Sequence, residues 1–220
     1  MALFTLEDVR FSSRGKEIIR GISMKIEPRT VTCLAGKSGC GKSTLLKLIS
    51  GILVPSGGRV FYKKSDIQTM SNARNRVFRR ECGFVFQDSA LWSNQEILQN
   101  LNLPLQTANP SMSYEKRMQR IHDVCALVKY ERAMNLRPVD LSMGEQKKIA
   151  FARALINKPS VLFLDECTES LDRKSGAIIV DLIQDFIAKG NTVIYVSHSS
   201  NFVNAMGGTS LVIEEGLLTE

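Results

Sequence analysis

The segment 36–43, with the sequence GKSGCGKS, matches the pattern G-x-x-x-x-G-K-[ST] of a phosphate-binding loop. Glycine has no Cβ atom, so it lets backbone N–H groups approach phosphate oxygens at the N-terminus of the next helix. Lys42 is expected to reach the β- and γ-phosphates, and the Ser43 hydroxyl is expected to bind Mg²⁺. A glycine-rich turn that only caps a helix is the alternative. The predicted phosphate-binding residues are Gly36, Lys37, Ser38, Gly39, Cys40, Gly41, Lys42, Ser43 and Thr44.

A second candidate site follows the apolar segment 161–164. Its next two residues, Asp165 and Glu166, would place a carboxylate for Mg²⁺ beside a carboxylate that activates water to attack a γ-phosphate. Adjacent acids can also cap a helix or mark a solvated strand end. Because they lie downstream of a phosphate-binding loop, ATP hydrolysis is favoured.

These residues need a sheet to position them, and the chain alternates apolar segments with helical ones. This alternation predicts an α/β fold, with a sheet covered by helices on both faces. The predicted strands are 31–35, 82–86, 161–164, 192–197 and 210–213, and the predicted helices are 42–50, 114–129, 145–156 and 176–189.

Two further regions depart from this alternation. Segments 4–11 and 17–26 resemble two strands joined by a turn around Arg14, which predicts an N-terminal antiparallel layer. Residues 88–140 are mostly polar and helical, and predict a helical lobe inserted into the sheet domain. We expect residues 1–220 to form a single domain.

Composition limits the class of protein. Hydrophobic residues make up 44% and charged residues 23%, which is typical of a folded globular chain. No apolar run approaches the roughly 18 residues of a membrane span, and the first ten residues do not resemble an export signal. We therefore expect a chain that is neither exported nor membrane-spanning. The net charge of +7 favours an anionic partner, such as nucleotide, nucleic acid or a lipid surface.

Five cysteines are scattered without C-x-x-C spacing, which favours a reducing cytosol over a disulfide framework or a zinc site. Cys40 lies inside the phosphate-binding loop, where backbone N–H groups, the helix dipole and Lys42 stabilise negative charge. We expect it to be the alkylation-sensitive thiol of this protein, protected by bound nucleotide. An inert side chain at a variable loop position is the alternative.

The segment 141–155, which begins LSMGEQ, resembles the signature of ABC transporter ATP-binding subunits. In that family a Leu-Ser-Gly-Gly-Gln-like turn lies about 20 residues before the strand-end acids, and Ser142 lies 23 positions before Asp165 here. The other family motifs occur in the family order: Gln87 follows a strand before the signature, and the segment Ser170-Leu171-Asp172 and then His198 come after it. The resemblance covers nearly the whole chain.

The resemblance implies a head-to-tail dimer that holds two ATP molecules, each between the phosphate loop of one subunit and the signature turn of the other. Gln87 would contact Mg²⁺ or the attacking water, Glu166 would polarise that water, and His198 would hold the γ-phosphate. Asp172 would couple the two sites. The implied Mg²⁺ ligands are Ser43, Gln87 and Asp165, and the implied signature residues in trans are Ser142, Met143, Gly144 and Glu145.

The chain departs from the family pattern at three places. Met143 replaces the first signature glycine, while Gly144 remains for a close approach to phosphate. Cys167 replaces the proline that usually follows the catalytic glutamate, which is expected to loosen that turn. Ser13 stands where the family has an aromatic residue that stacks on adenine, and Arg14 could stack there instead. Weak base recognition and tolerance of GTP are expected.

Two classes of function remain open. The segment 79–105 resembles the ATPases that maintain outer-membrane lipid asymmetry, followed by lipoprotein-releasing cassettes. The implied partners are transmembrane permease subunits and a second copy of this chain or a related subunit, at the cytoplasmic face of the inner membrane. The alternative is a DNA-repair or chromosome-maintenance ATPase. Those proteins insert long coiled coils between the Gln motif and the signature, so nucleic acid is the less favoured partner.

Overall fold

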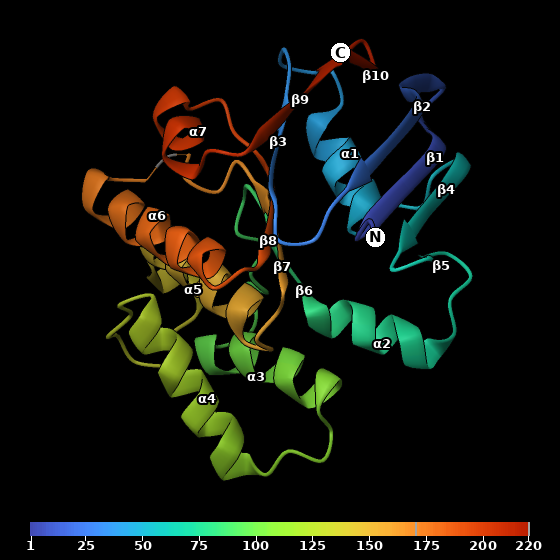
Figure 1. The fold of residues 1–220 in the computed structure, drawn as a ribbon. Coiled ribbons are helices and arrows are strands. Elements are labelled where there is room, and N and C mark those ends of the chain that lie inside the picture. Colours follow the sequence, from blue (N-terminus) through green and yellow to red (C-terminus); the bar gives the residue numbers. More distant parts are fainter. Residues whose placement is uncertain (170, 220) are drawn as a thin grey trace.

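The computed structural model describes residues 1–169 and 171–219 and arranges them as two β-sheets with helices between and around them (Figure 1). The strands are β1 (Phe4–Ser13), β2 (Lys16–Ile26), β3 (Val31–Ala35), β4 (Gly57–Tyr62), β5 (Ser65–Asp66), β6 (Cys82–Val85), β7 (Val161–Asp165), β8 (Thr192–Val196), β9 (Thr209–Glu214) and β10 (Leu217–Thr219). The helices are α1 (Lys42–Ile49), α2 (Asn72–Glu81), α3 (Ile97–Ala108), α4 (Tyr114–Leu127), the short 3₁₀ helix η1 (Pro138–Asp140), α5 (Met143–Leu155), α6 (Arg173–Ala188) and α7 (Ser200–Met206).

The larger sheet has the strand order β10-β9-β3-β8-β7-β6. Its strands from β9 to β6 pair in parallel, and β10 folds back antiparallel to β9. This confirms the predicted α/β fold. Because β3, β7 and β8 are neighbours and run in the same direction, the segments that follow them meet at one edge of the sheet.

The predicted N-terminal antiparallel layer is confirmed, and it is wider than the sequence indicated. It has the order β2-β1-β4-β5, with β4 antiparallel to β1. The strands β4 and β5 were not predicted. Their connecting turn is formed by Lys63 and Lys64, both with positive φ (47° and 67°), and such a turn lacks the usual glycine or asparagine signal.

Two hydrophobic cores lie on opposite faces of the larger sheet. On β3, Leu34 packs into the core shared with α1 and the antiparallel sheet, whereas its neighbour Cys33 packs into the core under α5 and α6. Phe163 and Leu164 divide in the same way on β7. This alternation follows from the period of two in a strand, and burial on both faces explains why these strands are continuous apolar runs in sequence.

The predicted helical lobe is confirmed as α3 and α4, which pack against each other and against α5 (Figure 1). Element ends differ from the predictions by a few residues. Helix α6 begins at Arg173, earlier than expected, because the Asp172 side chain caps it by accepting hydrogen bonds from the N–H groups of Lys174 and Ser175. Ser142 caps α5 in the same way, so that helix begins at Met143.

In the described ranges, none of the helices combines the length and the apolar character that crossing a membrane would require.

Candidate functional site

The predicted phosphate-binding loop joins the end of β3 to the start of α1. Its conformation requires glycine at two points. A Cβ atom on Gly36 (φ 140°) would lie 2.2 Å from the carbonyl oxygen of Ile213, and one on Gly41 (φ 107°) would lie 2.8 Å from Ile19. The loop is thus fitted between the C-terminal strands and β2, with no room for side chains at those glycines.

Lys42 is the first residue of α1, and its side chain turns back over the loop. The Lys42 ammonium donates hydrogen bonds to the carbonyl oxygens of Gly36 (2.9 Å) and Lys37 (2.8 Å). The N-cap of α1 is Gly41, which offers no side chain to the first N–H groups of the helix. Free N–H groups, the positive end of the helix dipole and an ammonium group together favour a phosphate at this place.

Ser43 and Asp165 meet at the edge of the sheet. The Ser43 hydroxyl donates a 2.6 Å hydrogen bond to Oδ1 of Asp165, and Lys47 Nζ lies 3.7 Å from Oδ2 of the same carboxylate. Asp165 ends β7 and is only 2% exposed. Its charge is therefore held in place by a hydroxyl and an ammonium group, as a buried charge requires.

Glu166, Gln87 and His198 converge directly after β7, β6 and β8. His198 Nε2 lies 3.4 Å from Oε1 of Glu166, and Gln87 Nε2 lies 3.4 Å from its Oε2. Glu166 has a positive φ of 45°, and its N–H donates to the carbonyl oxygen of Val196, which ties the ends of β7 and β8 together. Three residues far apart in sequence therefore form one cluster.

A second carboxylate, Glu169, belongs to this cluster. Gln87 Nε2 donates a 2.7 Å hydrogen bond to Oε2 of Glu169. The pKa of Glu166 lies above its ordinary value, first because burial disfavours the charged carboxylate and then because Glu169 adds negative charge nearby. A carboxylate whose pKa is raised toward neutrality is suited to accept a proton from water.

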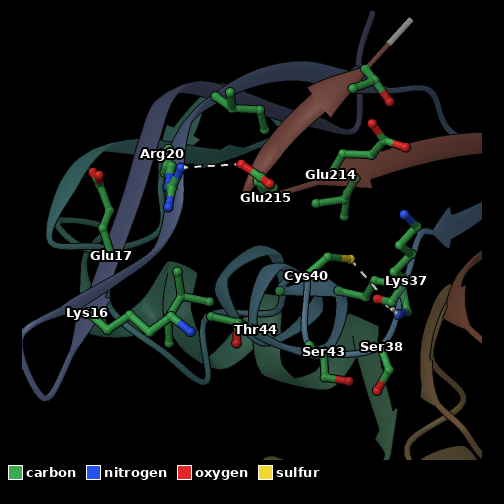
Figure 2. A pocket seen from close by; sticks show the side chains of 18 of the residues that line it. Lys16, Glu17, Arg20, Lys37, Ser38, Cys40, Ser43, Thr44, Glu214 and Glu215 are labelled. Atoms are coloured by element: carbon green, nitrogen blue, oxygen red, sulfur yellow. Dashed lines mark hydrogen bonds and ion pairs between the residues drawn. The ribbon is translucent and has the colours of Figure 1, made fainter.

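A cavity of about 1170 Å³ contains both halves of the site. Figure 2 shows Lys16, Glu17 and Arg20 of β2 on one wall, Glu214 and Glu215 of the β9–β10 hairpin on another, and the phosphate-binding loop between them. The catalytic cluster completes the lining with Gln87, Glu166, Glu169 and His198. The cavity is large enough for a nucleotide.

Ser13 and Arg14, which the sequence suggests as contacts of the nucleotide base, lie on the β1–β2 hairpin. Ser13 ends β1 and Arg14 lies in the β1–β2 turn, and neither is among the described residues that line the cavity. Ile18 of β2 and Leu217 of the C-terminal hairpin are among the residues that do line it. The hairpin is fixed there because Arg20 N–H donates to the carbonyl oxygen of Gly216.

The signature residues lie away from their own chain's cavity. Ser142 and Glu145 form a capping box at the start of α5, and Met143 is 61% exposed. A Cβ atom on Gly144 would lie 3.0 Å from Ser175 Oγ and 3.4 Å from Asp172 Oδ2, so this glycine packs closely on the start of α6. In the family segment Ser170-Leu171-Asp172, Ser170 lies outside the described residues.

Three residues that hold the cluster were not predicted from the sequence. They are Glu169 and two basic residues of α5, Lys147 and Arg153. Lys147 is buried, and its ammonium donates to the backbone carbonyl oxygen of Gln87. Arg153 donates to the carbonyl oxygens of Ser89 (2.9 Å) and Ala90 (2.7 Å). A lysine on the buried face of an amphipathic helix was the available signal.

Cys167, which replaces the usual proline, is 2% exposed and packs in the core under α5 and α6. Its thiol stays protonated at neutral pH, because burial raises its pKa to about 12. This side chain fills core space beside the catalytic turn.

The oxygen atoms at the site fit Mg²⁺. The Ser43 hydroxyl, the Asp165 carboxylate and the Gln87 amide oxygen belong to the hard oxygen ligands that Mg²⁺ prefers. Among the described residues, no group of three His, Cys, Asp or Glu side chains could hold a metal by itself. Mg²⁺ at nucleotide sites is commonly bound by one or two carboxylates together with substrate phosphates and water.

The sequence is similar to those of known ATP-binding proteins. Residues 19–169 match the family model of ABC transporters. The cell division ATP-binding protein FtsE of Escherichia coli (strain K12) is 35% identical over 205 residues, which are 93% of this chain and 91% of FtsE. The methionine import ATP-binding protein MetN of Cereibacter sphaeroides is 32% identical over 214 residues, covering 96% of this chain and 60% of MetN.

Solved structures agree in fold. The ATP-binding cassette MJ0796, in a dimeric post-hydrolysis state bound to ADP and Pi, superposes with a TM-score of 0.89 at 28% identity, over 99% of this chain and 97% of that one. The structure of cbiO1 from Clostridium perfringens, part of the transporter complex cbiONQ, has a TM-score of 0.80 at 28% identity, over 100% of this chain and 87% of that one.

The names of the two sequence relatives concern cell division and methionine import, and neither mentions the lipid or lipoprotein cargo suggested by segment 79–105. The family assignment does not depend on cargo. With a matching family model, relatives above 30% identity and a phosphate loop that faces a strand-end carboxylate, this chain belongs to the ABC transporter family and is an ATP-binding, ATP-hydrolysing subunit.

Proposed function

We propose that this chain works as a dimer, with residues 1–220 acting as one ATPase domain that drives a membrane permease. The observation that carries the proposal is that the phosphate loop and the catalytic cluster line one cavity, whereas the signature turn does not. A complete site therefore needs a signature turn from a second subunit, which is either a copy of this chain or a related one.

In this proposal each residue of the cavity has a separate task. The phosphate loop and Lys42 bind the phosphates, and Ser43, Asp165 and Gln87 hold Mg²⁺. Bound Mg²⁺ neutralises charge that develops on the transferred phosphoryl group. Glu166 accepts the proton of the attacking water, for which its raised pKa is suited. His198, 3.4 Å from Glu166, holds that carboxylate and contacts the γ-phosphate.

The dimer places the remaining predicted residues. Ser142, Met143, Gly144 and Glu145 would contact the nucleotide bound by the other subunit. Asp172 would couple the two sites, since it caps α6 next to Gly144 of the signature turn. The nucleotide base would lie between Ile18 and Leu217, where apolar contact replaces aromatic stacking. Apolar contact discriminates weakly between purines, so GTP would also be bound.

Mixing two inactive variants tests the composite site. Lys42→Ala removes phosphate binding and Ser142→Arg blocks the signature turn, so each variant alone should lose hydrolysis. In a mixed dimer one site has both lesions and the other has none, and the mixture should regain measurable ATPase activity. If the mixture stays as inactive as either variant, the sites are not shared between subunits.

The finer part of the proposal concerns partner and cargo. We propose that this chain binds a transmembrane permease at the cytoplasmic face of the inner membrane and that the cargo is a lipid or lipoprotein. The resemblance of segment 79–105 to lipid-asymmetry and lipoprotein-releasing ATPases supports this cargo. Purification of this chain from native membranes should recover an integral membrane protein with it. The purified complex should also contain more of the cargo lipid than the membrane as a whole. Recovery of nucleic acid instead, together with DNA-stimulated hydrolysis, would favour the repair or chromosome-maintenance class.

A further inference from the structure

Glu169 is a carboxylate in the catalytic cluster with no assigned role in phosphate binding or in activation of water. It lies in the turn after β7, lines the cavity, and accepts the 2.7 Å hydrogen bond from Gln87 Nε2. The hydrogen bond from the same nitrogen to Glu166 is longer, at 3.4 Å. Glu169 is therefore the main partner of the Gln87 side chain.

From this geometry we infer that Glu169 is a positioning residue that turns the amide oxygen of Gln87 toward Mg²⁺. The inference rests on the proposed function, in which Gln87 is an Mg²⁺ ligand. Glu169 acts through Gln87 and does not itself contact the metal. Glu166 contributes to the same orientation, since the Gln87 amide nitrogen donates to both Glu169 and Glu166.

The orientation follows from the chemistry of the partners. A carboxylate can only accept hydrogen bonds, and an amide has two donor hydrogens on nitrogen and an acceptor oxygen on the other side. If the Gln87 amide were rotated by half a turn, its oxygen would face two carboxylates and find no donor there. With nitrogen facing the carboxylates, the oxygen is left free to accept or to bind a cation.

The backbone of Gln87 is fixed as well. The buried ammonium group of Lys147 donates to the carbonyl oxygens of Phe86 and Gln87, and Arg153 donates to those of Ser89 and Ala90, two and three positions further on. With the main chain held from α5, rotation of the side chain is the remaining freedom. Glu169 removes that freedom, so the Gln87 side chain is already oriented before Mg²⁺ and nucleotide bind, and their binding carries no entropic cost of ordering it.

The test compares variants by Mg²⁺ titration of a fluorescent, slowly hydrolysed ATP analogue bound to the full chain, with binding in EDTA measured in parallel. Glu169→Ala should weaken the Mg²⁺ dependence by about 10- to 100-fold, as loss of a partner of a metal ligand does. Binding in EDTA should stay unchanged. The exposed carboxylate Glu131 gives the matched control, and Glu131→Ala should behave as the wild type.

Two conservative variants separate positioning from charge. Glu169→Gln keeps the length and an acceptor oxygen, so it should restore most of the Mg²⁺ affinity. Glu169→Asp keeps the charge but is too short to reach Gln87, so it should resemble Glu169→Ala. This pair also decides the question if Glu169→Ala fails to fold. The opposite ranking, with near wild-type Mg²⁺ affinity in Glu169→Asp and weakened Mg²⁺ affinity in Glu169→Gln, would overturn the inference in favour of a purely electrostatic role.

A double-mutant cycle with Gln87→Ala completes the test. If Glu169 acts through Gln87, adding Glu169→Ala to Gln87→Ala should cause no further loss of Mg²⁺ affinity. Undiminished additional loss would show that Glu169 binds the metal directly and would overturn the inference. So would wild-type Mg²⁺ dependence in Glu169→Ala. A wild-type chain without Mg²⁺-dependent nucleotide binding would instead contradict the proposed function itself.

Discussion

The Ser43 hydroxyl donates a 2.6 Å hydrogen bond to the carboxylate of Asp165, a residue 122 positions later in the chain. This contact joins the end of the phosphate loop to the end of β7 and brings together two of the oxygen atoms proposed to hold Mg²⁺. Asp165 is buried, and Lys47 Nζ lies 3.7 Å from its Oδ2, so the carboxylate is fixed in position where a cation would bind.

Asp165→Asn should separate metal binding from nucleotide binding. The amide oxygen of asparagine can still accept the Ser43 hydrogen bond, so the two strand ends should remain joined, but the charge is lost. Mg²⁺ affinity should fall by more than about tenfold, given that even supporting partners of metal ligands contribute 10- to 100-fold. Calorimetric titration of ADP with and without Mg²⁺ checks this, with Asp181→Asn on the exposed face of α6 as control. An unchanged Mg²⁺ dependence would remove Asp165 from the metal site.

Glu166→Gln should nearly stop turnover and leave Mg-ATP binding intact. Glutamine has a similar shape but cannot take the proton of the attacking water, and loss of a general base typically slows a reaction by about 10²- to 10⁴-fold. Uncleaved ATP should then hold two subunits together. Phosphate release measures the rate, and size-exclusion chromatography with Mg-ATP should show a dimer. Hydrolysis at the wild-type rate would exclude Glu166 as the base.

Trp92→Ala should weaken stimulation by the permease and leave basal hydrolysis nearly unchanged. The ring is 40% exposed, and Arg153 lies 5.4 Å from its centre. The Trp92 backbone is held separately by the side chain of buried Asn100. Because the ring is partly exposed, contact with a partner protein explains this tryptophan better than core packing does. An exposed tryptophan at an interface commonly contributes about 2 kcal/mol or more to binding.

ATPase assays with reconstituted permease check the Trp92 prediction. Leu127→Ala, which removes an exposed apolar side chain from α4, is the matched control and should have no effect on stimulation. Equal loss of basal and stimulated activity in Trp92→Ala would favour a role in folding.

Cys40 should be alkylated first among the five cysteines, and ATP should protect it. Its sulfur lies 4.0 Å from Lys42 Nζ on the loop that lines the cavity (Figure 2). Burial raises the pKa of Cys33, Cys82, Cys125 and Cys167, the last two to about 11 and about 12, so those thiols stay protonated near pH 7.5. Only a thiolate reacts rapidly with maleimide.

Mass spectrometry after limited alkylation, with and without Mg-ATP, checks the Cys40 prediction, and a maleimide adduct should abolish ATP binding. Cys40→Ser should bind ATP and lose the rapid labelling. Faster labelling of Cys82, or labelling that ATP does not slow, would contradict the position assigned to this loop.

The sequence by itself determined the parts of the site that are contiguous in the chain. The phosphate loop, the pair Asp165-Glu166 and the strands before them are short segments whose residue types specify local geometry, because glycine conformation, helix N-termini and apolar runs act over a few residues. The order of motifs along the chain then indicated the family. Turn positions without a glycine or asparagine signal, such as Lys63-Lys64, hid β4 and β5.

Only the tertiary structure decided which distant residues meet. Glu169 contacts Gln87 across 82 positions, and Lys147 reaches the Gln87 backbone across 60 positions. The helix pattern could indicate that Lys147 is buried, but it could not indicate its partner. The walls of the cavity likewise depend on how the C-terminal hairpin packs on β2, which brings Ile18 and Leu217 into the lining of one cavity. Such contacts arise from the order of strands in the sheet and the packing of helices on it, and no local pattern of residues encodes them.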